Sequence, residues 1–331
     1  MPNPVKQSEK VALVSCMRNE GLFLLEWVAY HQGLGFDTIL IITNNCTDGS
    51  DELAQALAQQ GHIIHIDQTV PTGASPQDTG MDLALTWLRA HEFTWVLHID
   101  SDEFLLIDHG NGQIADLLYD LQQADVVPIP WRNFGDSGVT NWTPGASVLN
   151  TFTSAEPEAQ KGITKFKCLF RVAHFERATD HNPLCPTIEN PCVLSPDAEP
   201  LSNRSLYQDK SSRFRPHDIA CRAKRARLNH YAVKSQDLFL MKNDRGDGQG
   251  KTSDSKYHIG SRWHRAANRN DIEDRTILRH WPETERRLAH LRATPTIASA
   301  EQHCQEWFVQ HRAEILTPDR RADWTRGKAR A

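Results

Sequence analysis

Residues 95–104 read Trp-Val-Leu-His-Ile-Asp-Ser-Asp-Glu-Phe, and the rest of the chain is organised around them. The stretch begins with apolar, β-branched and aromatic residues, a pattern that predicts a buried strand. It ends in three carboxylates within four residues, Asp100, Asp102 and Glu103. Because side chains alternate along a strand, we expect Asp100 and Asp102 to point the same way and Glu103 to point away.

Carboxylates at the end of a core strand need a physical reason. An ionised carboxylate is costly to bury unless it is paired, hydrogen-bonded or bound to a cation. Two oxygen ligands at this spacing suit Mg²⁺ or Mn²⁺, with the remaining positions left to water and the phosphates of a ligand. The alternative is an acidic turn whose carboxylates are solvated. These residues alone leave both interpretations open.

Three earlier apolar runs, at residues 11–16, 38–42 and 62–66, predict further strands. Helical patterns separate the runs and precede residue 95. Because these strands are continuously apolar and not alternating, they predict a parallel sheet covered by helices on both faces. The expected fold class is therefore α/β.

Polar residues follow each of these strands. Ligands of parallel sheets bind beyond the carboxyl ends of the strands. Ordinary turn chemistry explains each of these loops alone. Together with the carboxylates at residues 100–103, however, four polar loops meet at one edge of the sheet, and this favours a ligand site. The polar residues after the first three strands are Ser15, Arg18, Asn19, Glu20, Asn44, Asn45, Asp48 and Asp67.

The second half of the chain has weaker patterns. Pro128 and Pro130 confine the apolar run 125–130 to an edge strand or a sharp turn. Residues 131–138 are aromatic and glycine-rich, which suits either stacking on a sugar or base or a loop with a hydrophobic anchor. Residues 179–200 hold five prolines and predict a long loop. The last 65 residues or so predict peripheral helices.

Composition is typical of a globular protein, with 39% hydrophobic and 24% charged residues among 331. The seven cysteines form no C-x-x-C pair and so no structural zinc motif; we expect reduced thiols, with a Cys185–Cys192 bridge as the alternative. The first ten residues are polar, and no apolar run reaches the roughly 18 residues of a membrane span. We therefore expect a cytoplasmic protein.

Charge is unevenly distributed along the chain. The net charge is −5, yet residues 201–265 hold 15 Lys and Arg against 6 Asp and Glu. This basic segment predicts an anionic partner, either a phosphorylated ligand or the inner face of an anionic membrane, with a solvated helix face as the alternative. No nucleic-acid partner is expected, because no recognition motif is present and the whole chain is acidic.

Several of these pieces together resemble the GT-A glycosyltransferases, in a family 2-like branch related to the domain of unknown function 23 group. They are Arg18-Asn19-Glu20, Glu26-Trp27, Asn44-Asn45 with Ser50-Asp51, Asp100 to Phe104, Phe134 to Gly138, Lys165 to Arg171 and Leu228-Asn229-His230-Tyr231 with Lys234-Ser235. The resemblance covers residues 10–250. It implies a catalytic domain there, with a nucleotide-sugar-binding half at 10–125 and an acceptor and metal-completing half at 126–250, followed by a helical extension at 251–331.

The resemblance implies a GT-A type, Rossmann-like, mostly parallel sheet flanked by helices. It also implies a nucleotide-diphosphate sugar donor, with UDP-sugars favoured, and Mn²⁺ or Mg²⁺ as cofactor. The implied metal residues are Asp100, Asp102 and His230. The implied nucleotide-sugar-binding residues are Ser15, Arg18, Asn19, Glu20, Asn45, Asp48, Asp67, Asp100, Lys234 and Arg245.

The expected reaction is transfer of the sugar to a glycan or lipid-linked acceptor, with inversion and a general base. Asp136 is the first candidate for that base, followed by His174 and Glu189. Two alternatives remain: a catalytically weak sugar- or nucleotide-binding protein on the same fold, or a nucleotidyltransferase. A nucleotidyltransferase needs a glycine-rich, lysine-bearing first loop, whereas residues 18–21 supply one glycine.

Overall fold

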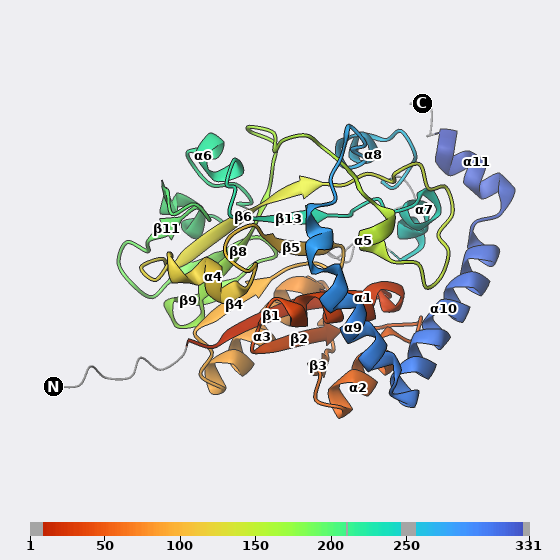
Figure 1. Cartoon of the computed structure of the whole chain (residues 1–331), viewed down its shortest axis with the longest axis horizontal. Helices are drawn as coiled ribbons and strands as arrows, with labels where there is room; N and C mark the ends of the chain where they lie inside the picture. The colour runs from red at the N-terminus through yellow and green to blue at the C-terminus, as the bar shows by residue number, and fades with distance from the viewer. Residues whose placement is uncertain (1–8, 210, 246–255, 327–331) are drawn as a thin grey trace.

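A ten-stranded mixed sheet runs through the computed structural model, which describes residues 9–209, 211–245 and 256–326 (Figure 1). Four neighbouring strands are parallel, in the order β3-β2-β1-β4. Their bounds are β1 (Val11–Met17), β2 (Thr38–Thr43), β3 (Ile64–Asp67) and β4 (Trp95–His98). The predicted strands are thus confirmed.

Helices cover both faces of these strands. One face packs against α1 (Gly21–Gly33) and α2 (Ser50–Gln59), and the other packs against α3 (Pro76–Ala90). Side chains of β1 alternate between the two cores: Leu13 belongs to the first and Val14 to the second. The α/β prediction, with a mostly parallel sheet between helices, is therefore confirmed.

The stretch 95–104 departs from its prediction. β4 ends at His98, a turn contains Ser101 and Asp102, and β5 (Glu103–Ile107) then begins as a separate strand. The expectation that strand alternation orients Asp100 and Asp102 is therefore wrong. The turn, and not the pleat, decides where each carboxylate points.

β5 is joined to the sheet by a late strand, β13 (Ala226–His230). β13 pairs antiparallel with β5 and parallel with β6 (Val126–Asn133), and its His230 lies opposite Glu103. Side chains of α1 also bond the β5 backbone: Trp27 donates to the Glu103 carbonyl and Tyr30 to the Leu105 carbonyl. The carboxylate turn is therefore held by segments more than 70 residues away on each side of it in the sequence.

The edge position predicted for residues 125–130 is wrong. β6 lies inside the sheet, with β8 (Phe166–Arg171) on one side and β11 (Val193–Leu194) and β13 on the other. The register explains how Pro128 and Pro130 are tolerated. Neither β11 nor β13 pairs with residues 127–130, so the missing proline N–H groups fall in the interval between these two strands.

The remaining elements are short or peripheral to the main sheet. Residues 179–200, predicted as a loop, contain the short strands β10 and β11, and Pro200 begins a third short strand, β12. The remaining strands are β7 (Ser154–Ala155), β9 (Phe175–Ala178), β10 (Pro183–Pro186), β12 (Pro200–Leu201) and β14 (Ile272–Glu273). The short helices are α4 (Ile114–Tyr119), α5 (Val148–Thr151), α6 (His217–Cys221) and α8 (Arg262–Ala267), with 3₁₀ turns at Val172–His174, Asn203–Tyr207 and Thr276–His280.

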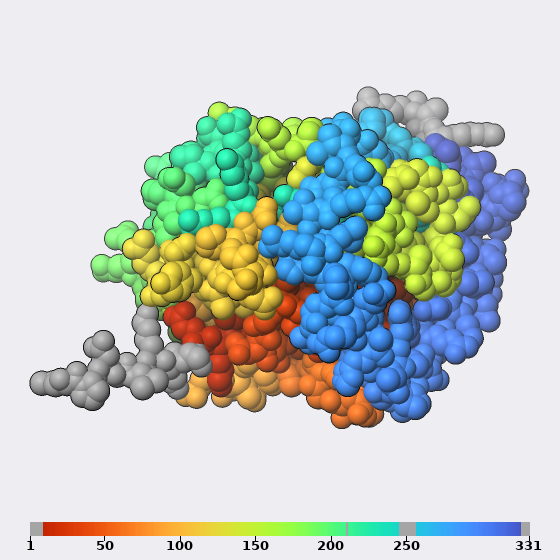
Figure 2. All heavy atoms as spheres, in the orientation of Figure 1, coloured from red at the N-terminus to blue at the C-terminus, as the bar shows by residue number. Residues whose placement is uncertain are grey.

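The C-terminal helices are part of the core and not only its periphery. They include α9 (Trp281–Arg292), α10 (Pro295–Ile315) and α11 (Pro318–Arg326), and α9 and α10 pack against α1. Figure 2 shows these C-terminal segments, in blue, covering the N-terminal elements over a broad face. Phe308 of α10 belongs to the same core as Leu13.

Two expectations concern the whole chain. All seven cysteines are free thiols, so the alternative Cys185–Cys192 bridge is absent. In the described ranges, no helix has the length and apolar character needed to cross a membrane.

Candidate functional site

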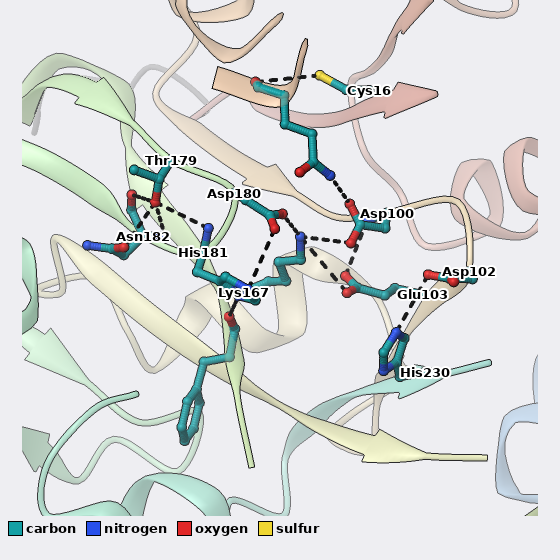
Figure 3. Close-up of polar contacts among 12 residues, drawn as sticks. Cys16, Asp100, Asp102, Glu103, Lys167, Thr179, Asp180, His181, Asn182 and His230 are labelled. Carbon is teal, nitrogen blue, oxygen red and sulfur yellow. Dashed lines mark hydrogen bonds and ion pairs between the residues drawn. The ribbon is translucent and has the colours of Figure 1, made fainter. Parts of the chain in front are cut away.

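A cavity of about 1110 Å³ opens at the carboxyl ends of β1 and β4, and we call it the strand-end cavity. Its wall combines side chains that are far apart in the sequence, and Figure 3 shows the charged part of it. The lining residues are Cys16, Met17, Arg18, Glu20, Gln77, Asp100, Ser101, Asp102, Trp131, Lys165, Asp180, His181, His230, Ala232, Lys242, Lys256, Tyr257 and Trp263.

Asp100 is held by other side chains of the protein. Lys167 of β8 is completely buried, and its Nζ lies 3.1 Å from Asp100 Oδ2. The same ammonium contacts Asp180 and lies 4.0 Å from Glu103 Oε1. Gln77 of α3 donates a hydrogen bond of 2.9 Å to the other oxygen, Asp100 Oδ1. Both oxygens of Asp100 are therefore already bonded within the protein.

Asp102 faces a different set of groups. Lys242 of α7 (Gln236–Arg245) donates to Asp102 Oδ2 at 3.0 Å and to the Ala232 carbonyl at 2.7 Å. The second oxygen, Asp102 Oδ1, lies 3.6 Å from Nε2 of His230. Asp102, His230 and Glu103 each offer one ligand atom, and these atoms lie within 4.8 Å of one another.

The hydrogen bonds of His230 determine which ring nitrogen carries the proton. The Asn133 amide donates from Nδ2 to the Glu156 carboxylate, so its Oδ1 is the atom that faces His230 Nδ1, at 3.2 Å. An amide oxygen only accepts, so Nδ1 carries the hydrogen and Nε2 has a free lone pair. Burial lowers the pKa of His230 to about 3, which keeps the ring neutral. Two electron-rich atoms, Nε2 and Asp102 Oδ1, therefore face each other.

Around the turn at residues 100–103, carboxylates outnumber the ammonium groups that they contact. Burial raises the pKa of Glu103 well above its ordinary value, and raises that of Asp100 to about 7 against the attraction of Lys167. Burial acts in the same direction on Asp102, but Lys242 leads the positive groups that hold its pKa well below the ordinary value. Four carboxylates of this cluster face two lysines. The donor set and the charge both fit a divalent cation beside Asp102 and His230.

The predicted nucleotide-sugar residues are divided between two cavities. Arg18, Glu20 and Asp100 line the strand-end cavity. Asn19, Glu20, Asp48 and Lys234 line a second cavity of about 620 Å³ between α1, α7 and α10, which we call the helical cavity. Glu20 and Lys242 line both.

Four predicted residues lie elsewhere. Ser15 is fully buried inside β1, while Asn45 is exposed in the loop after β2 and Asp67 is exposed at the end of β3. Asp67 lines a separate shallow cavity with His65. Arg245 ends α7, and its side chain lies outside the described residues.

The three general-base candidates do not line the strand-end cavity. Asp136 is buried, and its two carboxylate oxygens accept hydrogen bonds from Gly138, Asn268 and Asn270. His174 is bonded to Asp125 at 2.7 Å, and Glu189 is exposed in the loop between β10 and β11. The carboxylate of Asp136 therefore ties its own loop to the segment after α8. A general base must lie within hydrogen-bond reach of the acceptor hydroxyl in the complex, and the assignment of these three residues stays a prediction.

Sequence reasoning missed Lys167, Asp180 and Gln77. One signal for Lys167 was present: Lys165 and Lys167 alternate with apolar residues, so they share one face of β8. That face is the one turned to the cavity and not to solvent, which only the position of β8 beside β4 reveals. No local pattern marks Asp180, because its role comes from meeting Lys167 across the fold.

Comparison with known proteins identifies the family. The model of glycosyltransferase family 92 matches residues 13–184, more than half of the chain. The chain belongs to glycosyltransferase family 92. This confirms the glycosyltransferase class, and the family 2-like branch related to the domain of unknown function 23 group stays a prediction.

Curated relatives carry the same family description. The family 92 protein Os08g0121900 of Oryza sativa subsp. japonica is 29% identical over 166 residues, which cover 48% of this chain and 27% of the rice protein. The family 92 protein RCOM_0530710 of Ricinus communis is 28% identical over 176 residues, covering 51% of this chain and 31% of that protein. The matched part therefore spans less than a third of either relative.

Solved structures give a more distant likeness. S. aureus TarS 1-349 aligns over 86% of this chain and 73% of its own, with 11% identity and a TM-score of 0.35. Glucosyl-3-phosphoglycerate synthase from Mycobacterium tuberculosis, in complex with Mn²⁺ and uridine diphosphate among other ligands, aligns over 38% of this chain and 45% of its own, with 16% identity and a TM-score of 0.27. Scores this low do not assign a substrate to the family 92 chain.

Proposed function

We propose that this family 92 chain transfers a sugar from a nucleotide-diphosphate sugar, in the first place a UDP-sugar, to a glycan or lipid-linked acceptor with inversion. The observation that carries the proposal is the pair formed by Asp102 and neutral His230 at the strand ends, 3.6 Å apart in a cavity of about 1110 Å³. The strand-end cavity is large enough to admit a small-molecule ligand.

We assign the Mn²⁺ or Mg²⁺ ligands to Asp102 and His230, with Asp100 nearby. A bound divalent cation would supply Lewis-acid stabilisation of negative charge on the leaving diphosphate. The chain's own residues serve the same charge: Lys242 presents its ammonium beside Asp102, and Arg18 and Lys165 lie on the same cavity wall. Positive groups fixed where charge develops stabilise the transition state more than the ground state.

The sugar of the donor is proposed to lie against the aromatic part of the cavity. Trp131 lies 4.1 Å from His230 between ring centroids, and Tyr257 and Trp263 also line the wall. Aromatic faces bury the apolar faces of flat rings and exclude water from the bond that breaks.

The basic segment at residues 201–265 supports contact of the same protein with an anionic membrane surface. We keep a cytoplasmic location as part of the proposal.

The test is a panel of UDP-, GDP-, CMP- and dTDP-sugars, each with and without Mn²⁺. Release of the free nucleotide from one donor, dependent on the cation and abolished by Asp102→Ala, is expected. Binding of a donor without any release would favour the catalytically weak binding protein. An Asp102→Ala variant with undiminished turnover and cation-dependent nucleotide binding would contradict the proposal.

A further inference from the structure

The helical cavity has a lining unlike that of the strand-end cavity. Three elements far apart in the sequence contribute large apolar side chains: Phe23 from α1, Leu238 and Met241 from α7, and Trp307 and Phe308 from α10. α10 belongs to the C-terminal helices, to which the proposed function assigns no role. The cavity opens to solvent, and its volume of about 620 Å³ includes the space at its mouth.

Several polar groups in this lining are already engaged by the protein itself. Asp48 accepts hydrogen bonds from the backbone N–H groups of Gly21 and Ser50. His311 and Asp244 bond each other at 2.8 Å. A sugar needs several hydrogen-bonding groups that are directed at its hydroxyls, and groups held in this way offer few. The surface that a ligand meets there is mainly apolar.

The two cavities meet at two residues. Glu20 and Lys242 line both of them, and Glu20 is the carboxylate shared by the two linings within the described ranges. Glu20 is buried, with 5% exposure, directly before α1. Lys242 places its ammonium against Asp102 on the strand-end side. Glu20 and Lys242 therefore stand at the boundary between the helical cavity and the strand-end cavity.

We propose that the helical cavity is the acceptor subsite, that it takes an acceptor whose sugar carries an apolar tail, and that Glu20 is the general base. This inference rests on the proposed glycosyl transfer. The apolar tail lies between α1, α7 and α10, and the acceptor hydroxyl lies at the junction. Burial of a tail of several methylene groups favours such acceptors over the free sugar, because each buried methylene contributes to binding.

The reaction at the junction is a single displacement. The acceptor oxygen forms a bond to the anomeric carbon while the bond from that carbon to the diphosphate oxygen breaks. The electron pair of the broken bond leaves with the nucleoside diphosphate, and the proton of the acceptor hydroxyl passes to the Glu20 carboxylate. No oxidant or further reactant is needed.

The first experiment compares octyl β-glycosides of glucose, galactose and N-acetylglucosamine with the corresponding free sugars as acceptors. For the wild type we expect KM to be at least about tenfold lower for the accepted octyl glycoside than for its free sugar. Met241→Trp fills the cavity and should raise the KM of the octyl glycoside to that of the free sugar. The matched control is Val309→Trp, on the exposed side of α10, which should leave both the KM of the octyl glycoside and donor hydrolysis by water unchanged.

The second experiment tests the base. Glu20→Gln should lower kcat by roughly 10²–10⁴-fold and leave the KM for the donor unchanged, because the donor still binds. A kcat within tenfold of wild type would overturn the assignment of Glu20.

Two results would overturn the acceptor subsite. One is a tail-less oligosaccharide that is preferred over every octyl glycoside, and the other is a tail preference that survives Met241→Trp. Failure of the proposed transfer is distinguishable from both. If no nucleotide is released from any donor, binding of octyl glycosides is measured by quenching of tryptophan fluorescence in wild type and Met241→Trp. Binding lost in the variant supports the subsite, and equal or absent binding overturns it.

Discussion

The two aspartates of the turn lie in contrasting surroundings although they are two residues apart. Asp100 is bonded through both oxygens, to Lys167 and to Gln77. Asp102 is bonded to Lys242 through one oxygen, and its other oxygen faces the lone pair of neutral His230. The two aspartates of the D-x-D pair are therefore held differently: Asp100 is anchored through both oxygens, and Asp102 is the one that we propose as a cation ligand.

The largest expected effect separates the two residues by turnover. Asp102→Asn should lower kcat/KM for the donor on the order of 10³-fold, because it removes charge where the leaving diphosphate is stabilised. Asp100→Asn should cost about tenfold or less, because Lys167 already neutralises Asp100. Steady-state release of nucleotide measures both. Equal losses in the two variants would show that the aspartates act as one unit.

The next effect is on stability and tests the anchored side. Lys167→Met leaves the Asp100, Glu103 and Asp180 carboxylates without their shared cation, and should lower the free energy of unfolding by about 3–5 kcal/mol. Lys165→Met, directly before β8 and facing the Trp131 ring, is the control and should change the free energy of unfolding by about 1 kcal/mol or less. Urea unfolding measures the free energy of unfolding of both variants. A Lys167→Met variant as stable as the control would mean that Asp100 is not anchored.

Cation binding gives a third, smaller effect. Mn²⁺ at 100 times its Kd should raise the free energy of unfolding by about 2.7 kcal/mol in the wild type and in Asp100→Asn. The increase should disappear in Asp102→Asn and His230→Gln, because the facing oxygen and nitrogen are then lost. Unfolding with and without Mn²⁺, in the absence of nucleotide, measures it. The reverse pattern would place the cation at Asp100.

The smallest effect concerns pH. The pKa of Asp100 is raised by burial from 3.8 to about 7, so its contribution to stability is full below pH 3.8 and is lost as pH rises through 7. Asp100→Asn should therefore gain stability relative to the wild type, on the order of 1 kcal/mol per pH unit, between pH 4 and 7.

Asp102 should behave in the opposite way. Its pKa is held below 3.8, with Lys242 leading the positive groups that outweigh burial, so its contribution is present above pH 3.8 and is lost on further acidification. The stability difference between Asp102→Asn and the wild type should stay constant between pH 4 and 7. Unfolding curves at several pH values measure both variants. Parallel pH dependence of the two would remove the contrast between the aspartates.

Local patterns predicted the N-terminal part of the fold well. Continuous apolar runs, with helical periodicity between them, predicted the parallel strands β1 to β4 and their helices. β6 was harder, because its proline positions are compatible with an edge strand and also with an interior strand whose neighbours stop and start around them. That difference depends on the lengths of β11 and β13, which no pattern near residue 128 encodes.

The candidate site was predicted in part. Asp100, Asp102 and His230 do lie on one cavity, whereas Asp136, His174 and Glu189 do not line it. These three general-base candidates rest on residue type within predicted loops. Residue type does not reveal which loops lie together in the folded chain. Asp180 and Lys167 could not be linked in advance, because their contact exists only once β8 lies beside β4.

The sequence by itself determined that carboxylates follow a buried strand in a parallel α/β sheet, because apolar runs and the polar residues after them are local properties. Only the tertiary structure decided which of those carboxylates is anchored by Lys167 and which faces His230. The physical reason is that the pKa and partners of a buried charge are set by groups within a few ångströms, and here those groups come from β8, β13 and α7.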